Sequence, residues 1–146
     1  MLPRWHIFYG LLFTILLFVV APGVSVWYLL LVFLASIFID LDHYFAFVHK
    51  TGRISLLHSF EYHKKQGVWM RSQERSGLKP KSDFHLFHTI EFHALIGLLG
   101  MIWIGLFYLF IGMIFHSLLD VIDGVQRNTF HRREYFFFKW LAKKTL

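Results

Sequence analysis

Two long apolar segments separated by charged ones dominate the pattern of the chain. The first runs from Trp5 to Ile39 without Asp, Glu, Lys or Arg, and at about 1.5 Å per residue it is too long for one membrane crossing. An Ala-Pro-Gly sequence at 21–23 interrupts it, where proline removes a backbone donor and glycine tolerates a turn. The pattern predicts two short antiparallel helices, over about 5–20 and 24–40.

The second apolar segment, Ala94 to Phe115, fits either one spanning helix or a hairpin that turns near Gly105 to Gly112. A hairpin leaves all 15 Lys and Arg residues on one side of the membrane, as the positive-inside rule favours. Only a hairpin returns His116 and Asp120 to the side that carries His88. We therefore expect helices over about 84–105 and 110–123.

The segments between and after these helices are polar and basic. Eight of the 15 Lys and Arg residues lie in 44–87, so we expect a cytoplasmic loop over 44–83 with an interfacial helix near 54–70. The tail, 130–146, alternates aromatic and basic residues as an amphipathic surface helix does. The predicted fold is a single-domain, all-α integral membrane protein with four short transmembrane helices in two hairpins, and both termini in the cytoplasm.

Composition narrows the partners and the chemistry. Hydrophobic residues make up 56% of the chain and aromatic ones 20%, which places it in a membrane, here the inner (cytoplasmic) membrane. The net charge of +6 comes without a nucleic-acid-binding motif, so we expect membrane lipid as the partner and no nucleic acid. The chain has no cysteine but has ten His and nine Asp and Glu residues. The side chains that could bind a metal ion therefore offer nitrogen and oxygen atoms. That set suits zinc first, then manganese or iron.

Two clusters of ionisable residues lie at the ends of apolar segments, where unpaired charges are costly. Asp40, Asp42 and His43 follow the second predicted helix, and metal ligation explains three such groups better than a solvated helix end. His116 and Asp120 are four residues apart, so they share one helix face and can share a metal. The alternative for this pair is a His–Asp hydrogen bond inside the bundle.

A third cluster lies before the second apolar segment. A continuous helix would place His85, His88 and Glu91 along one ridge and turn His93 about 140° away. A helix that begins later would bring His93 to the metal in place of Glu91. We predict His88 as a ligand and keep Glu91 and His93 as candidates.

A short sequence in the loop resembles this third cluster. His58, Glu61 and His63 have the spacing of His88, Glu91 and His93, with a hydroxyl residue after the first histidine. Six positions in a His- and Phe-rich chain coincide by chance more often than by duplication. If the repeat is real, the loop copy would supply ligands to a second metal ion.

These residues resemble a known family. Asp-Leu-Asp-His at 40–43, two histidines five apart, and His-x-x-x-Asp at 116–120 are similar to inner-membrane metal-dependent hydrolases once described as LexA-binding, which distantly resemble zinc-dependent phospholipase C. The match covers roughly residues 40–123. By resemblance the metal ligands are Asp42, His43, His88, His93, His116 and Asp120. The family has Arg-Gly and Thr where this chain has Thr89-Ile90 and Glu91-Phe92, which makes Glu91 a replacement group.

The function that these observations predict is a membrane-embedded metal-dependent hydrolase of a phosphoester or lipid-linked substrate at the cytoplasmic face. Glu91 and Asp42 are the candidate catalytic carboxylates. The residues that follow the site and carry the charge to hold a phosphate are Arg127, His131, Arg132 and Arg133. Alternatives are a membrane di-iron oxidase, a non-enzymatic metal-binding, haem-binding or transport protein, and a scaffold with incidental histidines.

Overall fold

A computed structural model describes residues 3–145 of the protein. Within that range all regular structure is helical, so the all-α prediction is confirmed. The α-helices are α1 (Pro3–Val20), α2 (Val26–Phe38), α3 (Leu41–Thr51), α4 (Leu56–Arg75), α5 (Ile90–Leu99), α6 (Ile104–Gln126) and α7 (Phe137–Thr145). Two 3₁₀ turns, η1 (Leu86–His88) and η2 (Phe130–Arg132), lie in the connections.

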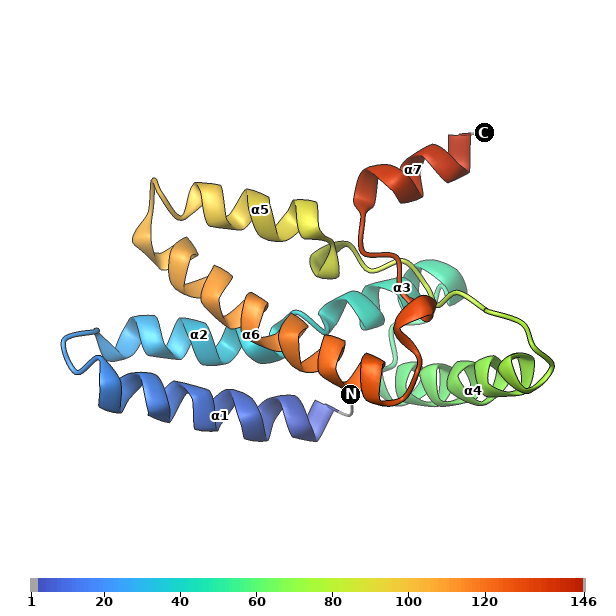
Figure 1. Ribbon diagram of the computed structural model, residues 1–146, viewed down its shortest axis with the longest axis horizontal. Helices are drawn as coiled ribbons and strands as arrows, with labels where there is room; N and C mark the ends of the chain where they lie inside the picture. The colour runs from blue at the N-terminus through green and yellow to red at the C-terminus, as the bar shows by residue number, and fades with distance from the viewer. Residues whose placement is uncertain (1–2, 146) are drawn as a thin grey trace.

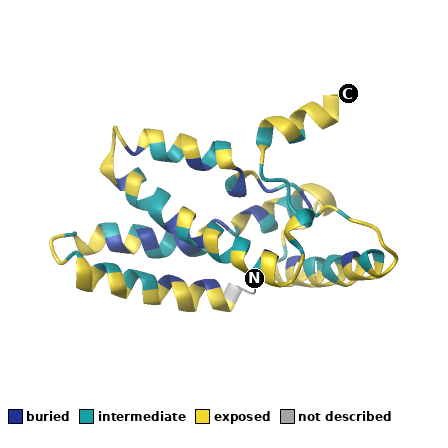
Figure 2. Cartoon of the chain, viewed as in Figure 1, coloured by how far each residue is buried: buried dark blue, intermediate teal, exposed yellow. Residues whose placement is uncertain are grey.

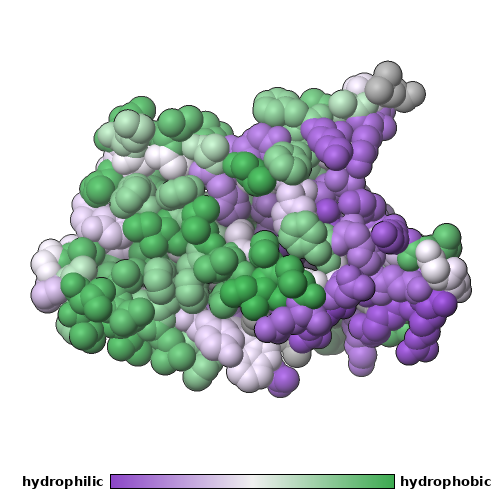
Figure 3. Space-filling model, in the orientation of Figure 1, coloured by the Kyte–Doolittle hydropathy of each residue, from purple (hydrophilic) through white to green (hydrophobic). Residues whose placement is uncertain are grey.

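The apolar half of the molecule consists of two helical hairpins, α1–α2 and α5–α6, whose tips lie at the same end (Figure 1). Helix α2 packs between α1 and α6, and α6 also packs on α5. Outward-facing side chains on these helices are large and apolar, and this end forms one hydrophobic surface (Figure 3). Buried residues gather where the two hairpins meet (Figure 2).

Two helical stretches are long and apolar enough to cross a membrane, Val26–Thr51, which joins α2 to α3, and Ile104–Gln126. Helices α1 and α5 are apolar but shorter. Helix α3 continues the direction of the chain past Asp40 and ends at Gly52, whose positive φ of 67° closes the helix. The loop expected from residue 44 onward therefore begins only after Thr51.

The second hairpin turns at Gly100 to Trp103, earlier than the expected turn at Gly105 to Gly112. Gly112 has a different role, because it lies where α6 crosses α2. A Cβ atom there would overlap the carbonyl oxygen of Val32 and lie 2.9 Å from Cβ of Ala35. The glycine that suggested a turn lets two helix backbones approach each other.

The polar half holds α3, α4 and the C-terminal segment. Helix α4 extends beyond the interfacial helix expected at 54–70, and the Ser55 side chain caps it. Arg132 donates two hydrogen bonds to the Glu74 carboxylate, at 2.7 and 2.5 Å, which lowers the pKa of Glu74. The tail expected at 130–146 forms η2 and α7, except that Leu146 lies outside the described residues. The Arg132–Glu74 contact ties the start of the tail to α4.

A candidate metal centre where the hairpins meet

Four side chains from three separate segments converge at the polar end of the hairpin bundle: Asp40, His88, His116 and Asp120. Asp40 lies between α2 and α3, His88 ends η1, and His116 and Asp120 are one turn apart on α6. One ligand atom from each residue lies within 4.8 Å of all the others. Among the residues that the structure describes, this is the one such group.

The spacing of these atoms suits a tetrahedral ion. The two imidazole Nε2 atoms, of His88 and His116, are 3.3 Å apart. Asp120 Oδ2 lies 3.3 Å from Nε2 of His116 and 3.7 Å from Nε2 of His88. Asp40 Oδ1 lies 3.5 and 3.7 Å from the same two nitrogens. Ligands about 2.0–2.1 Å from a tetrahedral zinc ion are about 3.3 Å from one another, so little movement is needed to bind one.

The opposite edges of both imidazole rings are held by hydrogen-bond acceptors. His116 Nδ1 lies 2.8 Å from the carbonyl oxygen of Ser36, and His88 Nδ1 lies 3.3 Å from Oδ2 of Asp42. Each Nδ1 therefore carries a hydrogen, and the Nε2 atoms of the two rings face each other. Two imidazole nitrogens at this distance are stabilised by a proton or a cation that both can bind. This arrangement is the one that metal-binding histidines adopt.

Burial favours the neutral form of the His88 imidazole. The pKa of His88 lies well below its usual value, first because the ring is removed from water and then because of the positive charge of Arg133. A neutral imidazole is the form that binds a metal. The side chains of His88 and His116 are fully buried, whereas Asp40 keeps 23% of its side-chain surface exposed. The centre therefore opens to its surroundings on the Asp40 side.

Two further residues, His6 and Asp42, contact the side chains of the group of four. The ring of His6, on α1, stacks on His116 with ring centroids 3.9 Å apart, and its Nε2 lies 3.2 Å from Oδ1 of Asp120. Asp42 accepts hydrogen bonds from the backbone N–H of Phe87 and from His88. The candidate catalytic carboxylate Asp42 thus lies on the far side of the His88 ring from the ligand atoms, where it orients the imidazole.

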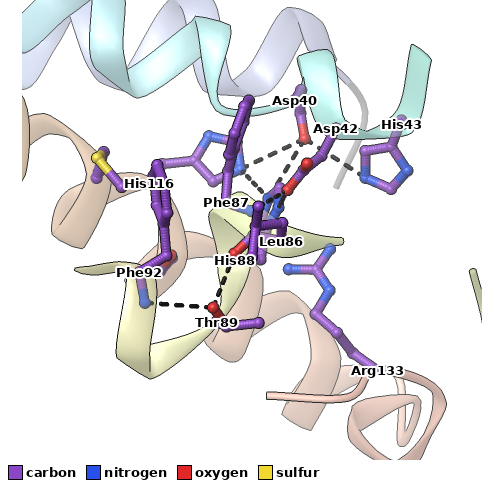
Figure 4. Close-up of polar contacts among 12 residues, drawn as sticks. Asp40, Asp42, His43, Leu86, Phe87, His88, Thr89, Phe92, His116 and Arg133 are labelled. Carbon is purple, nitrogen blue, oxygen red and sulfur yellow. Dashed lines mark hydrogen bonds and ion pairs between the residues drawn. The ribbon is translucent and has the colours of Figure 1, made fainter. Parts of the chain in front are cut away.

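Arg133 is the basic residue that reaches the centre. Its Nη1 donates a 2.8 Å hydrogen bond to Asp120 Oδ2, and Figure 4 shows its guanidinium directed toward the cluster. The other three candidate phosphate-binding residues have different partners. Arg127 pairs with Asp123 on the surface of α6, while His131 and Arg132 both contact Glu74 on α4.

Four of the eight predicted metal ligands are not in this group of four. Asp42 and His43 contact members of the group, His88 and Asp40, while Glu91 and His93 lie away from it. Thr89 caps α5, so the helix begins after His88 and turns Glu91 toward the tail. The Glu91 carboxylate accepts hydrogen bonds from the backbone N–H groups of Phe137 and Phe138, at 2.9 and 3.3 Å, at the start of α7. His93, on α5, has Nδ1 2.8 Å from the carbonyl oxygen of Thr89 and Nε2 3.0 Å from Oγ of Ser117 on α6. Both candidates therefore hold helices together.

A second histidine cluster flanks the centre. His43 Nε2 lies 3.5 Å from Asp40 Oδ1, and its ring packs against those of His85 and His63. Burial lowers the pKa of His85 to about 2. His63 Nε2 lies 2.9 Å from the backbone carbonyl oxygen of His43, so the loop histidine contacts α3 through the backbone. His58 is exposed on α4.

The sequence interpretation missed His6. The segment from Trp5 to Ile39 contains no Asp, Glu, Lys or Arg, and His6 is its one histidine. A titratable side chain within an apolar helix signals a buried polar partner, and that signal was available from the sequence. Which partner it finds, Asp120, depends on the packing of α1 near the end of α6.

Searches against protein-family models, curated proteins and solved structures find no match to this chain. The resemblance to inner-membrane hydrolases therefore stays a prediction based on the motifs alone. The geometry by itself supports a His/Asp group that could hold a metal ion, and it leaves the type of metal open.

Proposed function

We propose that the protein is a multi-pass membrane protein of the inner membrane that uses a divalent metal ion, zinc first among the candidates, to hydrolyse a phosphoester. The observation that carries this proposal is the pair of facing Nε2 atoms of His88 and His116, flanked by the carboxylates of Asp40 and Asp120. The resemblance of the motifs to membrane metal-dependent hydrolases supports the same assignment. We propose Asp40, His88, His116 and Asp120 as the ligands.

The distribution of charge supports four membrane-inserted helices. The hairpin tips, 21–25 and 100–103, contain no charged residue, whereas all 15 Lys and Arg residues lie in the remaining segments. Positive residues are retained on the cytoplasmic side, so both termini and the metal centre would face the cytoplasm. Helix α7 carries Trp140 and Lys144 with the cation over the ring, as suits a helix lying among lipid headgroups.

The residues around the centre fit the chemistry of phosphoester hydrolysis. A divalent ion held there would polarise a phosphoryl oxygen and lower the pKa of a water molecule toward neutrality. Arg133 lies beside the ligand atoms and would bind a second phosphoryl oxygen in place of Asp120. The open side at Asp40 gives water and substrate access, while Asp42 and His6 keep the ligands oriented.

The test is metal analysis followed by an activity assay on the same preparations. Protein purified in detergent without added metal is compared as wild type, His116→Ala and the exposed-residue control His49→Ala. We expect bound metal and hydrolysis of bis-p-nitrophenyl phosphate in the wild type and in His49→Ala, and loss of both in His116→Ala. Equal metal content in His116→Ala would refute the site. Metal-loaded protein without turnover would refute the hydrolase and leave a metal-binding or transport protein.

A further inference from the structure

An apolar groove lies next to the candidate metal centre, between α2, α5 and α6. Its volume is about 200 Å³. Every side chain that lines it is apolar: Ala35, Phe38, Ile39, Phe87, Phe92, Ile96, Leu109 and Met113. Water needs two to four polar partners in such a space and finds no side-chain partner among these. The groove is therefore suited to hydrocarbon.

One end of the groove adjoins the metal ligands. Ile39 directly precedes Asp40, and Phe87 directly precedes His88. Met113 lies three residues before His116 on α6, so the two side chains share a helix face. Figure 4 shows Phe87 and Phe92 among the residues that surround the cluster. A molecule that fills the groove thus ends beside the ligand atoms.

The other end of the groove faces the apolar surface of the hairpins. Phe38 lines the groove while 52% of its surface is exposed, so the wall at this point is part of the surface that we propose faces lipid. At roughly 30 Å³ for each water-sized group, the volume accommodates about seven such groups, which is a substantial part of an acyl chain. A chain from the bilayer could enter sideways without crossing water.

The positive charge of Arg133 beside the apolar groove suits an amphiphilic ligand with an anionic group. Arg133 lies at the ligand atoms, where it pairs with Asp120 and is largely buried. A phospholipid carries its phosphoester directly next to its acyl chains, so one molecule would place hydrocarbon in the groove and phosphate between Arg133 and the centre. A soluble phosphoester would leave the groove unfilled.

We propose that the groove binds an acyl chain of a bilayer phospholipid and that the phosphoester of the same lipid is the substrate of the centre. This inference rests on the proposed hydrolase function and names its substrate class. The groove would act as the element that determines specificity. The proposal predicts that the protein hydrolyses long-chain phospholipids in preference to small phosphodiesters, which would contact the proposed metal ligands but not the groove.

The proposal is tested by a tryptophan substitution at Ile96, which lines the groove, and by the same substitution at the exposed Leu95 as a control. Ile96→Trp places a large ring in the groove, and Leu95→Trp adds the same ring on the exposed side of α5. Metal-loaded protein is reconstituted in vesicles of phosphatidylethanolamine and phosphatidylglycerol that contain phosphatidylglycerol with a diazirine in one acyl chain. Crosslinked peptides are then mapped. We expect labelling of Phe87 to Ile96 in the wild type and in Leu95→Trp, and background labelling there in Ile96→Trp.

The second readout is the ratio of kcat/KM for long-chain phosphatidylglycerol to that for bis-p-nitrophenyl phosphate. We expect a fall of about tenfold or more in Ile96→Trp, and none in Leu95→Trp, with metal content equal in both. Ile96→Phe serves as a smaller replacement if Ile96→Trp does not fold. Equal labelling in all variants, or crosslinks to a second copy of the chain, would overturn the groove proposal. Groove labelling without any turnover would overturn the hydrolase and leave a lipid-binding groove.

Discussion

Asp42 offers the sharpest test of how the centre is organised, because it touches a proposed ligand and not the ion. Its carboxylate accepts the Nδ1 hydrogen of His88 at 3.3 Å and the backbone N–H of Phe87. Asp42→Leu removes the acceptor, so the His88 ring loses the contact that fixes its tautomer. Asp42→Asn keeps an acceptor oxygen and removes the negative charge. The two variants therefore separate orientation from charge.

The expected loss of zinc affinity follows from mutations of residues that hydrogen-bond metal ligands in other proteins. Such mutations weaken metal binding by about 10- to 100-fold. We expect the Asn variant near the lower value and the Leu variant near the upper one. These losses correspond to about 1.4 and 2.7 kcal/mol of binding free energy. The difference arises because a carboxylate acceptor makes a stronger hydrogen bond than a neutral amide.

The assay is a competitive zinc titration against a fluorescent chelator, with protein in detergent. Asp83→Asn is the matched control, because Asp83 is also a buried carboxylate but pairs with Lys50 and Tyr62. Its zinc affinity should equal that of the wild type. If Asp42→Leu also binds zinc as tightly as the wild type, the hydrogen bond does not orient His88 and the reasoning fails. A loss of equal size in Asp83→Asn would trace the effect to the fold.

Three further predictions concern the fold. Single cysteines at Met101 and Leu78, both exposed, should react with a membrane-impermeant thiol reagent from opposite sides of the membrane; labelling from one side would contradict the hairpin. Gly112→Ala should lower the free energy of unfolding by about 1–3 kcal/mol, because its Cβ overlaps the α2 backbone. Gly23→Ala, in open space at a hairpin tip, should have little effect in the same thermal unfolding assay. Below about pH 6.5, His85 should destabilise the metal-free protein by about 1.4 kcal/mol per pH unit.

The sign of that pH effect follows from the direction of the pKa shift. Burial lowers the pKa of His85 to about 2 in the folded chain, whereas an unfolded histidine has a pKa of about 6.5. Between these values only the unfolded chain binds the proton, so its binding favours unfolding as the pH falls. His85→Asn should flatten the dependence of the unfolding midpoint on pH. An unchanged slope in that variant would show that His85 does not cause it.

Sequence periodicity and ligand spacing were informative wherever the structure depends on local features. The i, i+4 spacing of His116 and Asp120 places both on one face of α6, and the structure brings both into the group of four. The apolar segments and the Ala-Pro-Gly interruption indicated the helices of the first hairpin. In these cases the helix repeat alone determines which side chains share a face.

Features that depend on distant contacts were not accessible in the same way. The positions of Glu91 and His93 are an exception, because they follow from a local feature that the sequence interpretation did not use: the Thr89 side chain caps α5, so the helix begins after His88. The role of Glu91 depends on the docking of the start of α7, 46 residues further along the chain. The role of Gly112 in helix packing, and not in a turn, likewise depends on a neighbour on α2, since glycine serves both purposes.

The positions of the four proposed ligand residues along the chain have a consequence for biosynthesis. Asp40 and His88 emerge from the ribosome well before His116 and Asp120, so a nascent chain with only its first hairpin inserted offers half of the donor atoms. Tight capture of the ion would then follow the docking of α6 against α2. If these residues bind a metal as proposed, metal loading would mark the completed docking of the second hairpin on the first.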